Sequence, residues 1–180
     1  LIAIGDGPNE TIWTGATDTV CLTINAANVQ VENFKFRPPA YTAGTPAAIV
    51  LGTSASYAKI RKNRFQGKTG SYFAIYSPAT GADNVEISDN EFIYLNNVTT
   101  VNGSAIVGVA AVNSYSGWQI LRNKFNSCVI CIDLSARCCI IKDNTLMLAG
   151  DKADSTLGTV MTTGIHLDGS LYTINAVMPA

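Results

Sequence analysis

The chain has 180 residues, of which 47% are hydrophobic and 14% are charged, and its formal net charge is −1. This length fits one domain with a proper core, so we expect residues 1–180 to form a single domain cut from a longer polypeptide. The charge balance argues against disorder and against nucleic-acid binding through a basic patch. No apolar run reaches the roughly 18 residues of a spanning helix, which argues against membrane insertion.

A repeated pattern runs through the chain from residue 28 to residue 146. Each copy has a central aliphatic residue and a large apolar residue five places later, with polar and apolar residues alternating around the first. Alternation with a period of two predicts a strand and disfavours a helix. The aliphatic positions are Val31, Ile60, Ile87, Ile120 and Ile141, and the later apolar positions are Phe36, Phe65, Phe92, Phe125 and Leu146.

A second apolar strand precedes each copy, for example at residues 49–51 and 130–134, and residues 165–167 lead to a further strand around Ile174. One unit is therefore a strand, a short corner, a strand, an Asn turn, a Phe and a loop. Such a unit cannot bury its own apolar side, so stacked units are expected to form an all-β solenoid of about six coils with parallel ladders. An up-and-down sandwich has similar strand spacing but gives no reason for the repeated corner.

Asparagine recurs three residues after the central aliphatic residue, at Asn63, Asn90, Asn123 and Asn144, whereas Asn33 stands one place early in the first copy. Asparagine tolerates the left-handed conformation and bonds its neighbours, so we expect it to form the structural turn. Stacked amides can also bond one coil to the next. The phenylalanines are expected to stack inside the coils.

Charged residues gather near these turns. The cations Arg61, Lys62 and Arg64 are expected to pair with carboxylates of the next coil. Those carboxylates are Glu86, Asp89 and Glu91, and the charged edge continues through Arg122, Lys124, Lys142 and Asp143. A calcium site is the less favoured interpretation, because a turn separates Glu86 from Asp89.

Five cysteines are present, at Cys21, Cys128, Cys131, Cys138 and Cys139. An odd number in a chain of this length does not indicate a disulfide framework. Zinc is an alternative, but adjacent cysteines on a strand point to opposite faces and cannot easily share one ion. Buried thiols in a reducing compartment are the favoured interpretation, and we predict no metal and no cofactor.

The loops that follow each Phe vary widely in length, so variation falls on one edge of the solenoid, where such folds usually bind their partners. The loop at residues 37–48 contains Tyr41, and the loop at residues 93–104 contains Tyr94, Asn96 and Asn97. These uncharged side chains suit sugar hydroxyls and a packed protein neighbour equally well. They are the candidate ligand-binding residues.

One group of residues is a candidate site for acid–base catalysis. Aligning Ile132 with Ile165 places Asp133 beside His166, the only histidine, with Asp168 close by. The three side chains would form an outward-facing cluster on neighbouring coils. They are the candidate catalytic residues, and a solvated Asp–His pair on a strand face is the plainer alternative.

The repeat resembles the right-handed parallel β-helix of the pectin-lyase-like superfamily. The resemblance rests on segments such as Asn84-Val-Glu-Ile-Ser-Asp-Asn-Glu-Phe92 and on the opening residues 4–12, which are closest in character to phage tailspike and tail-fibre segments. The Asn-x-Asp, Asp-Asp and Gly-His-Gly motifs of its polygalacturonase-type hydrolases are absent from the sequence. The scaffold hosts lyases, hydrolases, epimerases and non-catalytic spikes, so the likeness predicts the fold better than the function.

The resemblance and the missing motifs together favour a virion structural protein. We expect a β-helix segment of a phage tailspike, tail fibre or capsid-attached spike that contributes to attachment to host-surface glycan. Such a protein would be assembled in the host cytoplasm, reside in the virion, form a homotrimer and contact other virion proteins. The alternative is a polysaccharide-degrading enzyme, a glycoside hydrolase or lyase, that uses Asp133, His166 and Asp168 or coils outside this segment. A bacterial cell-surface adhesin is a weaker third option.

Overall fold

The computed structural model describes residues 11–67, 70–78, 82–95, 104–108, 115–147, 163–167 and 172–177. These residues form strands, turns and loops, and the described part of the chain contains no helix. Accordingly, no helix among the described residues could span a membrane. The chain is all-β, as the sequence predicts.

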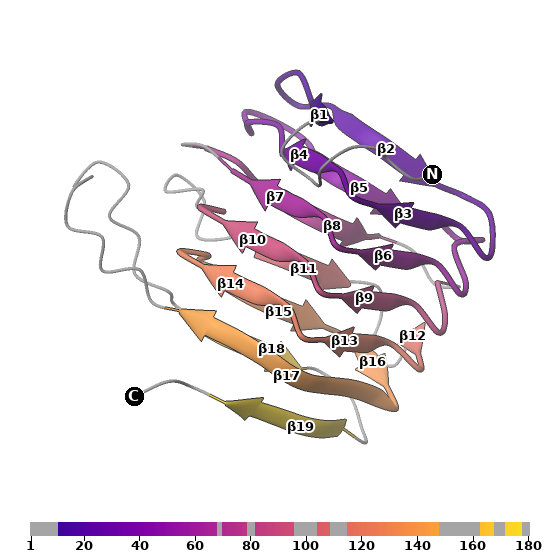
Figure 1. The fold of residues 1–180 in the computed structure, drawn as a ribbon. Helices are drawn as coiled ribbons and strands as arrows, with labels where there is room; N and C mark the ends of the chain where they lie inside the picture. Colours follow the sequence, from indigo (N-terminus) through magenta and orange to yellow (C-terminus); the bar gives the residue numbers. More distant parts are fainter. Residues whose placement is uncertain are drawn as a thin grey trace.

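Strands from successive repeats stack in parallel and form three ladders (Figure 1). The β2 ladder contains β2 (Val20–Ile24), β5 (Ala47–Leu51), β8 (Phe73–Ser77), β11 (Ser104–Gly108), β15 (Ile130–Leu134) and β18 (Thr163–Leu167). The β3 ladder contains β3 (Gln30–Glu32), β6 (Lys59–Arg61), β9 (Glu86–Ser88), β13 (Gln119–Leu121), the first part of β17 (Cys139–Met147) and β19 (Tyr172–Val177). The β4 ladder contains β1 (Ile12–Thr14), β4 (Lys35–Arg37), β7 (Arg64–Gln66), β10 (Glu91–Ile93), β14 (Lys124–Asn126) and the last part of β17.

The long strand β17 belongs to two ladders and joins them into one 11-stranded sheet, whereas the β2 ladder is a separate six-stranded sheet. A short parallel pair, β12 (Tyr115–Ser116) and β16 (Ala136–Arg137), lies outside both sheets. The chain visits the ladders in a fixed order, β2 to β3 to β4 and then β5, and repeats this order coil after coil. This arrangement is consistent with a β-solenoid.

The register within each ladder is the one that the repeat predicts. The central aliphatic residues pair strand to strand, from Val31 with Ile60 to Ile141 with Ile174. The later apolar positions pair in the same way, from Phe36 with Phe65 to Phe125 with Leu146. The register decides which side chains face the core. A slip of one residue would move the core-facing side chains of a strand to its outer face.

The β4 ladder is formed by a third strand in each coil. The sequence prediction treated the residues of this strand as part of the turn. Its strands are mostly three residues long, and only the middle side chain, such as Phe65, belongs to the main core cluster, although Ile93 of β10 is also buried. A single inward residue gives no alternation to detect, so the prediction of two strands per coil was wrong. The corrected unit has one strand on each of three faces.

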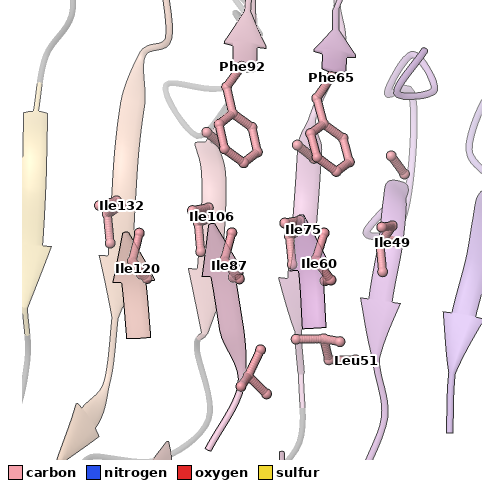
Figure 2. Close-up of a cluster of buried hydrophobic side chains, with 14 of the residues drawn as sticks. Ile49, Leu51, Ile60, Phe65, Ile75, Ile87, Phe92, Ile106, Ile120 and Ile132 are labelled. Carbon is pink, nitrogen blue, oxygen red and sulfur yellow. The ribbon is translucent and has the colours of Figure 1, made fainter. Parts of the chain in front are cut away.

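The core is a column of identical contacts repeated from coil to coil (Figure 2). Phe36, Phe65, Phe92 and Phe125 are fully buried, and their ring centroids are 5.1, 4.9 and 4.8 Å apart in sequence order, with nearly parallel rings. Trp13 continues the stack at one end, 6.0 Å from Phe36. Figure 2 also shows the isoleucine rows of the β2 and β3 ladders side by side. Each fully buried side chain of this size contributes roughly 1.5–3 kcal/mol through removal from water.

The asparagine turn forms a second column, parallel to the aromatic one. Asn63, Asn90, Asn123 and Asn144 are at most 2% exposed. The Oδ1 atom of each of the last three accepts the backbone N–H of the preceding asparagine in the column at 2.9 Å. The same Oδ1 atoms accept the preceding Nδ2 at 3.0 to 3.2 Å. The predicted bonding of stacked amides is therefore present among the described residues.

The backbone reason given for these asparagines was wrong. The residue with a left-handed backbone is the one before each asparagine: Lys62 (φ 54), Asp89 (φ 58), Arg122 (φ 53) and Asp143 (φ 57). In the first coil Asn33 (φ 65) has this conformation, and Phe34 takes the ladder position, donating its N–H to Asn63 Oδ1 at 3.0 Å. Asn33 is therefore not a displaced ladder residue, because it holds the bend itself. The column asparagines are selected by their side-chain bonds.

Ion pairs do join neighbouring coils, but with partners different from several that we expected. Arg64 Nε lies 3.1 Å from Glu91 Oε2, as predicted. Arg61 and Lys62 instead contact Glu32 of the preceding coil, at 3.4 and 2.9 Å. Asp89 also pairs with Arg122 of the next coil, at 2.8 Å, and Lys142 lies 3.8 Å from its sequence neighbour Asp143. Glu86 accepts the Ser88 hydroxyl at 2.7 Å.

Candidate functional site

The candidate site lies on the outer side of the β2 ladder. One row of residues pairs in register across six neighbouring strands: Thr23, Val50, Tyr76, Val107, Asp133 and His166. Val107 is 1% exposed yet belongs to a hydrophobic cluster separate from the core. The outer side of this sheet is therefore covered in part and is not a plain solvated surface.

An aromatic cluster occupies the middle of this outer side. Tyr72, Phe73 and Tyr76 are each less than 10% exposed and pack with Ala47 and Val107. The Phe73 and Tyr76 rings are 4.9 Å apart and nearly parallel. Burial raises the pKa of Tyr76, and the neighbouring Tyr72 acts in the same direction. A buried phenol of this kind stays protonated and can donate or accept a hydrogen bond.

Tyr41, a predicted ligand-binding residue, joins this cluster from the loop between β4 and β5. Its ring stacks on Tyr72 with centroids 4.5 Å apart, and its side chain is half-buried. Its backbone N–H donates to Gly70 O at 2.9 Å, and Ala40 pairs with Ser71 in an antiparallel bridge. These contacts hold the ring in one place over the sheet.

Asp18 fixes the next residues of the same loop. Its carboxylate accepts the N–H groups of Thr42 and Ala43 at 2.5 and 2.8 Å, and it also accepts the Thr42 hydroxyl. The Thr42 hydroxyl, followed by the two backbone N–H groups, lowers the Asp18 pKa. The loop is therefore tied both to the aromatic cluster and to the preceding coil, which gives Tyr41 a preorganised position.

The candidate catalytic residues lie at the other end of the row. Asp133 on β15 pairs in register with His166 on β18, so the two backbones are one ladder step, about 4.8 Å, apart. Asp133 is half-buried. Tyr76 is two steps from Asp133, roughly 10 Å, with Val107 between them. The third residue of the predicted cluster, Asp168, lies outside the described residues.

The second predicted loop is described only at its start. Tyr94 is half-buried, has a left-handed backbone (φ 55) and donates its N–H to Asn126 O at 3.0 Å. It turns the chain out of β10 against the next coil. Asn96 and Asn97 lie outside the described residues, so their ligand-binding role stays a prediction.

No metal site emerges from the part of the chain that the structure describes, where no group of three or more His, Cys, Asp or Glu side chains could hold an ion. None of the five cysteines forms a disulfide: Cys128, Cys131 and Cys139 are buried, Cys21 is half-buried and Cys138 is exposed. Burial raises the pKa of Cys21 and that of Cys139 to about 11. The Cys128 side chain and burial both raise the pKa of Cys131.

Sequence reasoning missed the aromatic cluster because alternation breaks within β8. Phe73 and Ile75 are two residues apart, a spacing that puts both on one face of a regular strand, yet Phe73 lies in the outer cluster and Ile75 in the core. Ala74 and Ile75 both lie in the core, as do Ala48 and Ile49 of β5, whereas Phe73 and Tyr76 on either side of the pair belong to the outer cluster. The signal available in the sequence was the unbroken apolar run Tyr72-Phe-Ala-Ile-Tyr76, which is too apolar for a strand with one wet face.

Comparison of the chain with protein-family models, curated proteins and solved structures gives no match.

Proposed function

We propose that the chain is a segment of a right-handed parallel β-helix of about six coils, of the pectin-lyase-like kind, that serves a phage tailspike, tail fibre or capsid-attached spike in attachment to host-surface glycan. The observation that carries the proposal is the outer side of the β2 ladder, where Tyr41 is held over a buried aromatic cluster. Rigid aromatic rings edged by uncharged polar groups are typical of sugar-binding surfaces, because the ring packs on the apolar face of a sugar while hydroxyls bond around it.

The rest of the fold supports a structural role. The stacked asparagines repeat the same hydrogen bonds from coil to coil, and the stacked phenylalanines repeat the same ring contacts. Such repetition suits a stiff rod that presents a surface, rather than a domain that closes on a substrate. A homotrimer would cover further side-wall surface of such a rod. Light scattering on the purified chain tests this part: a trimer supports it, and a clean monomer overturns it.

Glycan binding is tested with Tyr41→Ala. We expect the chain to bind one or more polysaccharides from a panel of bacterial surface glycans in biolayer interferometry. Truncation of Tyr41 should weaken that binding about tenfold, because it removes the stacked ring from the surface. Tyr57→Ala is the matched control. Tyr57 is 54% exposed at the corner before β6, and it belongs neither to the outer aromatic cluster nor to the core. Equal losses in the two variants would contradict the proposed site.

A polysaccharide-degrading enzyme is the second candidate, and the register of Asp133 with His166 favours it. A carboxylate and an imidazole on adjacent coils can share a proton and act as general acid and base. Incubation with the bound glycan, followed by assay for reducing ends or unsaturated products, tests this alternative. Product formation that is lost in Asp133→Asn would establish the enzyme and overturn a purely structural role.

A further inference from the structure

A different face of the rod carries an unusual distribution of charge. In the β4 ladder the middle residue of each short strand points into the core, so the residues on either side of it form two outward rows. One row is Lys35, Arg64, Glu91, Lys124 and Thr145. The other is Arg37, Gln66, Ile93, Asn126 and Met147, of which Ile93 is buried. Figure 1 shows strands β4, β7, β10 and β14 following one another along one side of the stack.

These rows contain four cations and one carboxylate, Glu91, which gives a local net charge of +3. The whole chain, by contrast, has 12 basic and 13 acidic residues and a net charge of −1. The rest of the sequence is therefore acidic by comparison. A concentration of cations against the sign of the whole chain favours a surface with an anionic partner.

The cations of this face are arranged side by side. Lys35 pairs in register with Arg64, and Arg37 lies two residues further along the same strand as Lys35. Burial lowers the pKa of Lys35, and the positive charges of Arg64 and Arg37 lower it further. Like charges on adjacent strands destabilise the folded chain, so this arrangement is unfavourable in the absence of an anion.

The one carboxylate is shared between two cations. Glu91 lies in register between Arg64 and Lys124, and its Oε2 atom is 3.1 Å from Arg64 Nε. Its side chain is 43% exposed, which leaves this pair well screened by solvent. Glu91 therefore offsets only part of the positive charge of the row.

The neighbouring β3 ladder is balanced in a way that the β4 ladder is not. Glu32 on its outer side contacts both Arg61 and Lys62. Along the adjoining corner the left-handed residues alternate in sign from coil to coil, as Lys62, Asp89, Arg122 and Asp143. Cations and carboxylates of neighbouring coils thus pair with each other near the β3 ladder. The net positive charge of the β4 ladder differs from this pattern.

We propose that the outer face of the β4 ladder binds an anionic polysaccharide, with its carboxylate, phosphate or sulfate groups placed against Lys35, Arg37, Arg64 and Lys124. Lys35 and Arg64 are one ladder step of about 4.8 Å apart, and Lys124 lies two steps beyond Arg64, with Glu91 between them. A polymer with several anionic groups can therefore contact more than one of these cations along the stiff face. This inference rests on the proposed function and deepens it, since it names the charge of the glycan and adds a second contact face.

The test compares dextran sulfate with uncharged dextran, which share one backbone and differ in charge. Binding of the purified chain is measured by biolayer interferometry at low and at high ionic strength. We expect dextran sulfate alone to bind, with an affinity that falls as salt rises. The double variant Lys35→Gln with Arg37→Gln should weaken this binding about tenfold.

The matched control is Lys59→Gln with Lys142→Gln, which removes the same charge from exposed positions of the β3 ladder. It should change affinity less than about twofold. Equal losses in the two double variants would show general polyanion attraction and overturn the inference, as would a failure of dextran sulfate to bind at low ionic strength. If Lys35→Gln with Arg37→Gln does not fold, Lys124→Gln in the same face replaces it, against Lys59→Gln.

Failure of this inference and failure of the proposed function give different results. A chain that binds bacterial surface glycan through Tyr41, and is unaffected by loss of Lys35 and Arg37, retains the proposed function and refutes the anionic face. A chain that binds dextran sulfate through the β4 ladder, with no loss in Tyr41→Ala on any surface glycan, supports the charged face and refutes the aromatic site.

Discussion

The Oδ1 atom of Asn90 accepts two hydrogen bonds from Asn63, one from its backbone N–H at 2.9 Å and one from its Nδ2 at 3.2 Å. Asn90 in turn donates from Nδ2 to Ile60 O at 2.8 Å and to Asn123 Oδ1 at 3.1 Å. One buried amide therefore joins three coils. The asparagine column is a continuous network, and removal of the Asn90 side chain leaves groups with fewer partners on both sides.

Asn90→Ala should accordingly destabilise the chain by about 3 kcal/mol, because it leaves the buried backbone N–H of Asn63 and the carbonyl of Ile60 with fewer bonds. Denaturant unfolding followed by circular dichroism measures the change. Asn126→Ala is the control, since Asn126 is half-buried on the outward row of the β4 ladder, and it should cost less than about 0.5 kcal/mol. A comparable cost in the two variants would contradict the network.

The phenylalanine stack predicts coupling between neighbours. Phe65 and Phe92 have centroids 4.9 Å apart with an interplanar angle of 5°. A double-mutant cycle with Phe65→Leu and Phe92→Leu should give a coupling energy of about 1 kcal/mol.

The matched pair is Phe36 with Phe125, which occupy the same column three ladder steps apart, roughly 14 Å. Their cycle should be additive within about 0.5 kcal/mol. Coupling of equal size in both cycles would indicate a general loosening of the core, and the stack would then not act through direct contacts.

The pair of Asp89 with Arg122 predicts a pH dependence. Arg122 donates to both carboxylate oxygens of Asp89 at 2.8 Å, and these bonds lower the Asp89 pKa. A carboxyl whose pKa is lowered by folding adds stability above its unfolded pKa of about 4, and this contribution disappears as pH falls through the folded value. Both side chains are more than a third exposed, so the pair contributes only about 0.5 kcal/mol.

Arg122→Gln should therefore raise the Asp89 pKa toward its usual value, as followed by carboxyl chemical shifts in a pH titration. The small loss of stability should be present at neutral pH and absent in strong acid. Lys59→Gln removes one positive charge from an exposed position of β6 and should leave the Asp89 titration unchanged. An Asp89 pKa that does not move in Arg122→Gln would contradict the assignment.

The cysteines should react at very different rates. Cys138 is exposed, whereas Cys128, Cys131 and Cys139 are buried. Burial raises the pKa of Cys139 and that of Cys21 to about 11, which lowers the fraction of reactive thiolate. One thiol should therefore react promptly with a disulfide reagent, and all five should react after unfolding. Loss of the prompt phase is expected in Cys138→Ser, and prompt reaction of several thiols in the folded chain would argue against this core.

The sequence predicts those parts of the fold in which a residue type recurs for a packing reason. Phe92 and Asn90 stand at fixed distances from Ile87, and all three lie buried in register with their equivalents on the next coil. Their residue types alone report burial and side-chain bonding. For that reason the core, the register and the amide column could be anticipated.

Other features leave no such trace in the sequence. The left-handed corner is occupied by Lys62, Asp89 and Arg122, which have no common preference for that conformation. Short strands such as Lys124–Asn126 place one residue in the core, so their sequence shows no alternation of apolar and polar residues. The partner of Lys62 depends on which neighbouring coil its side chain reaches.

The candidate site shows the same limit. Register between Asp133 and His166 follows from aligning apolar residues, so it could be predicted. The position of Tyr41 against Tyr72 could not, because it depends on an antiparallel bridge between Ala40 and Ser71 in two different loops. Loop-to-loop contacts of this kind have no repeated sequence pattern.

The most direct test of the account is size-exclusion chromatography of the purified chain mixed with a polysaccharide that it binds, with the length of the polymer measured in the same run. The account predicts that the protein co-elutes with the polymer and that the polymer keeps its full length. A protein that elutes alone would contradict glycan attachment. A polymer that shortens with time, and does not shorten with Asp133→Asn, would contradict the structural role in favour of the enzyme.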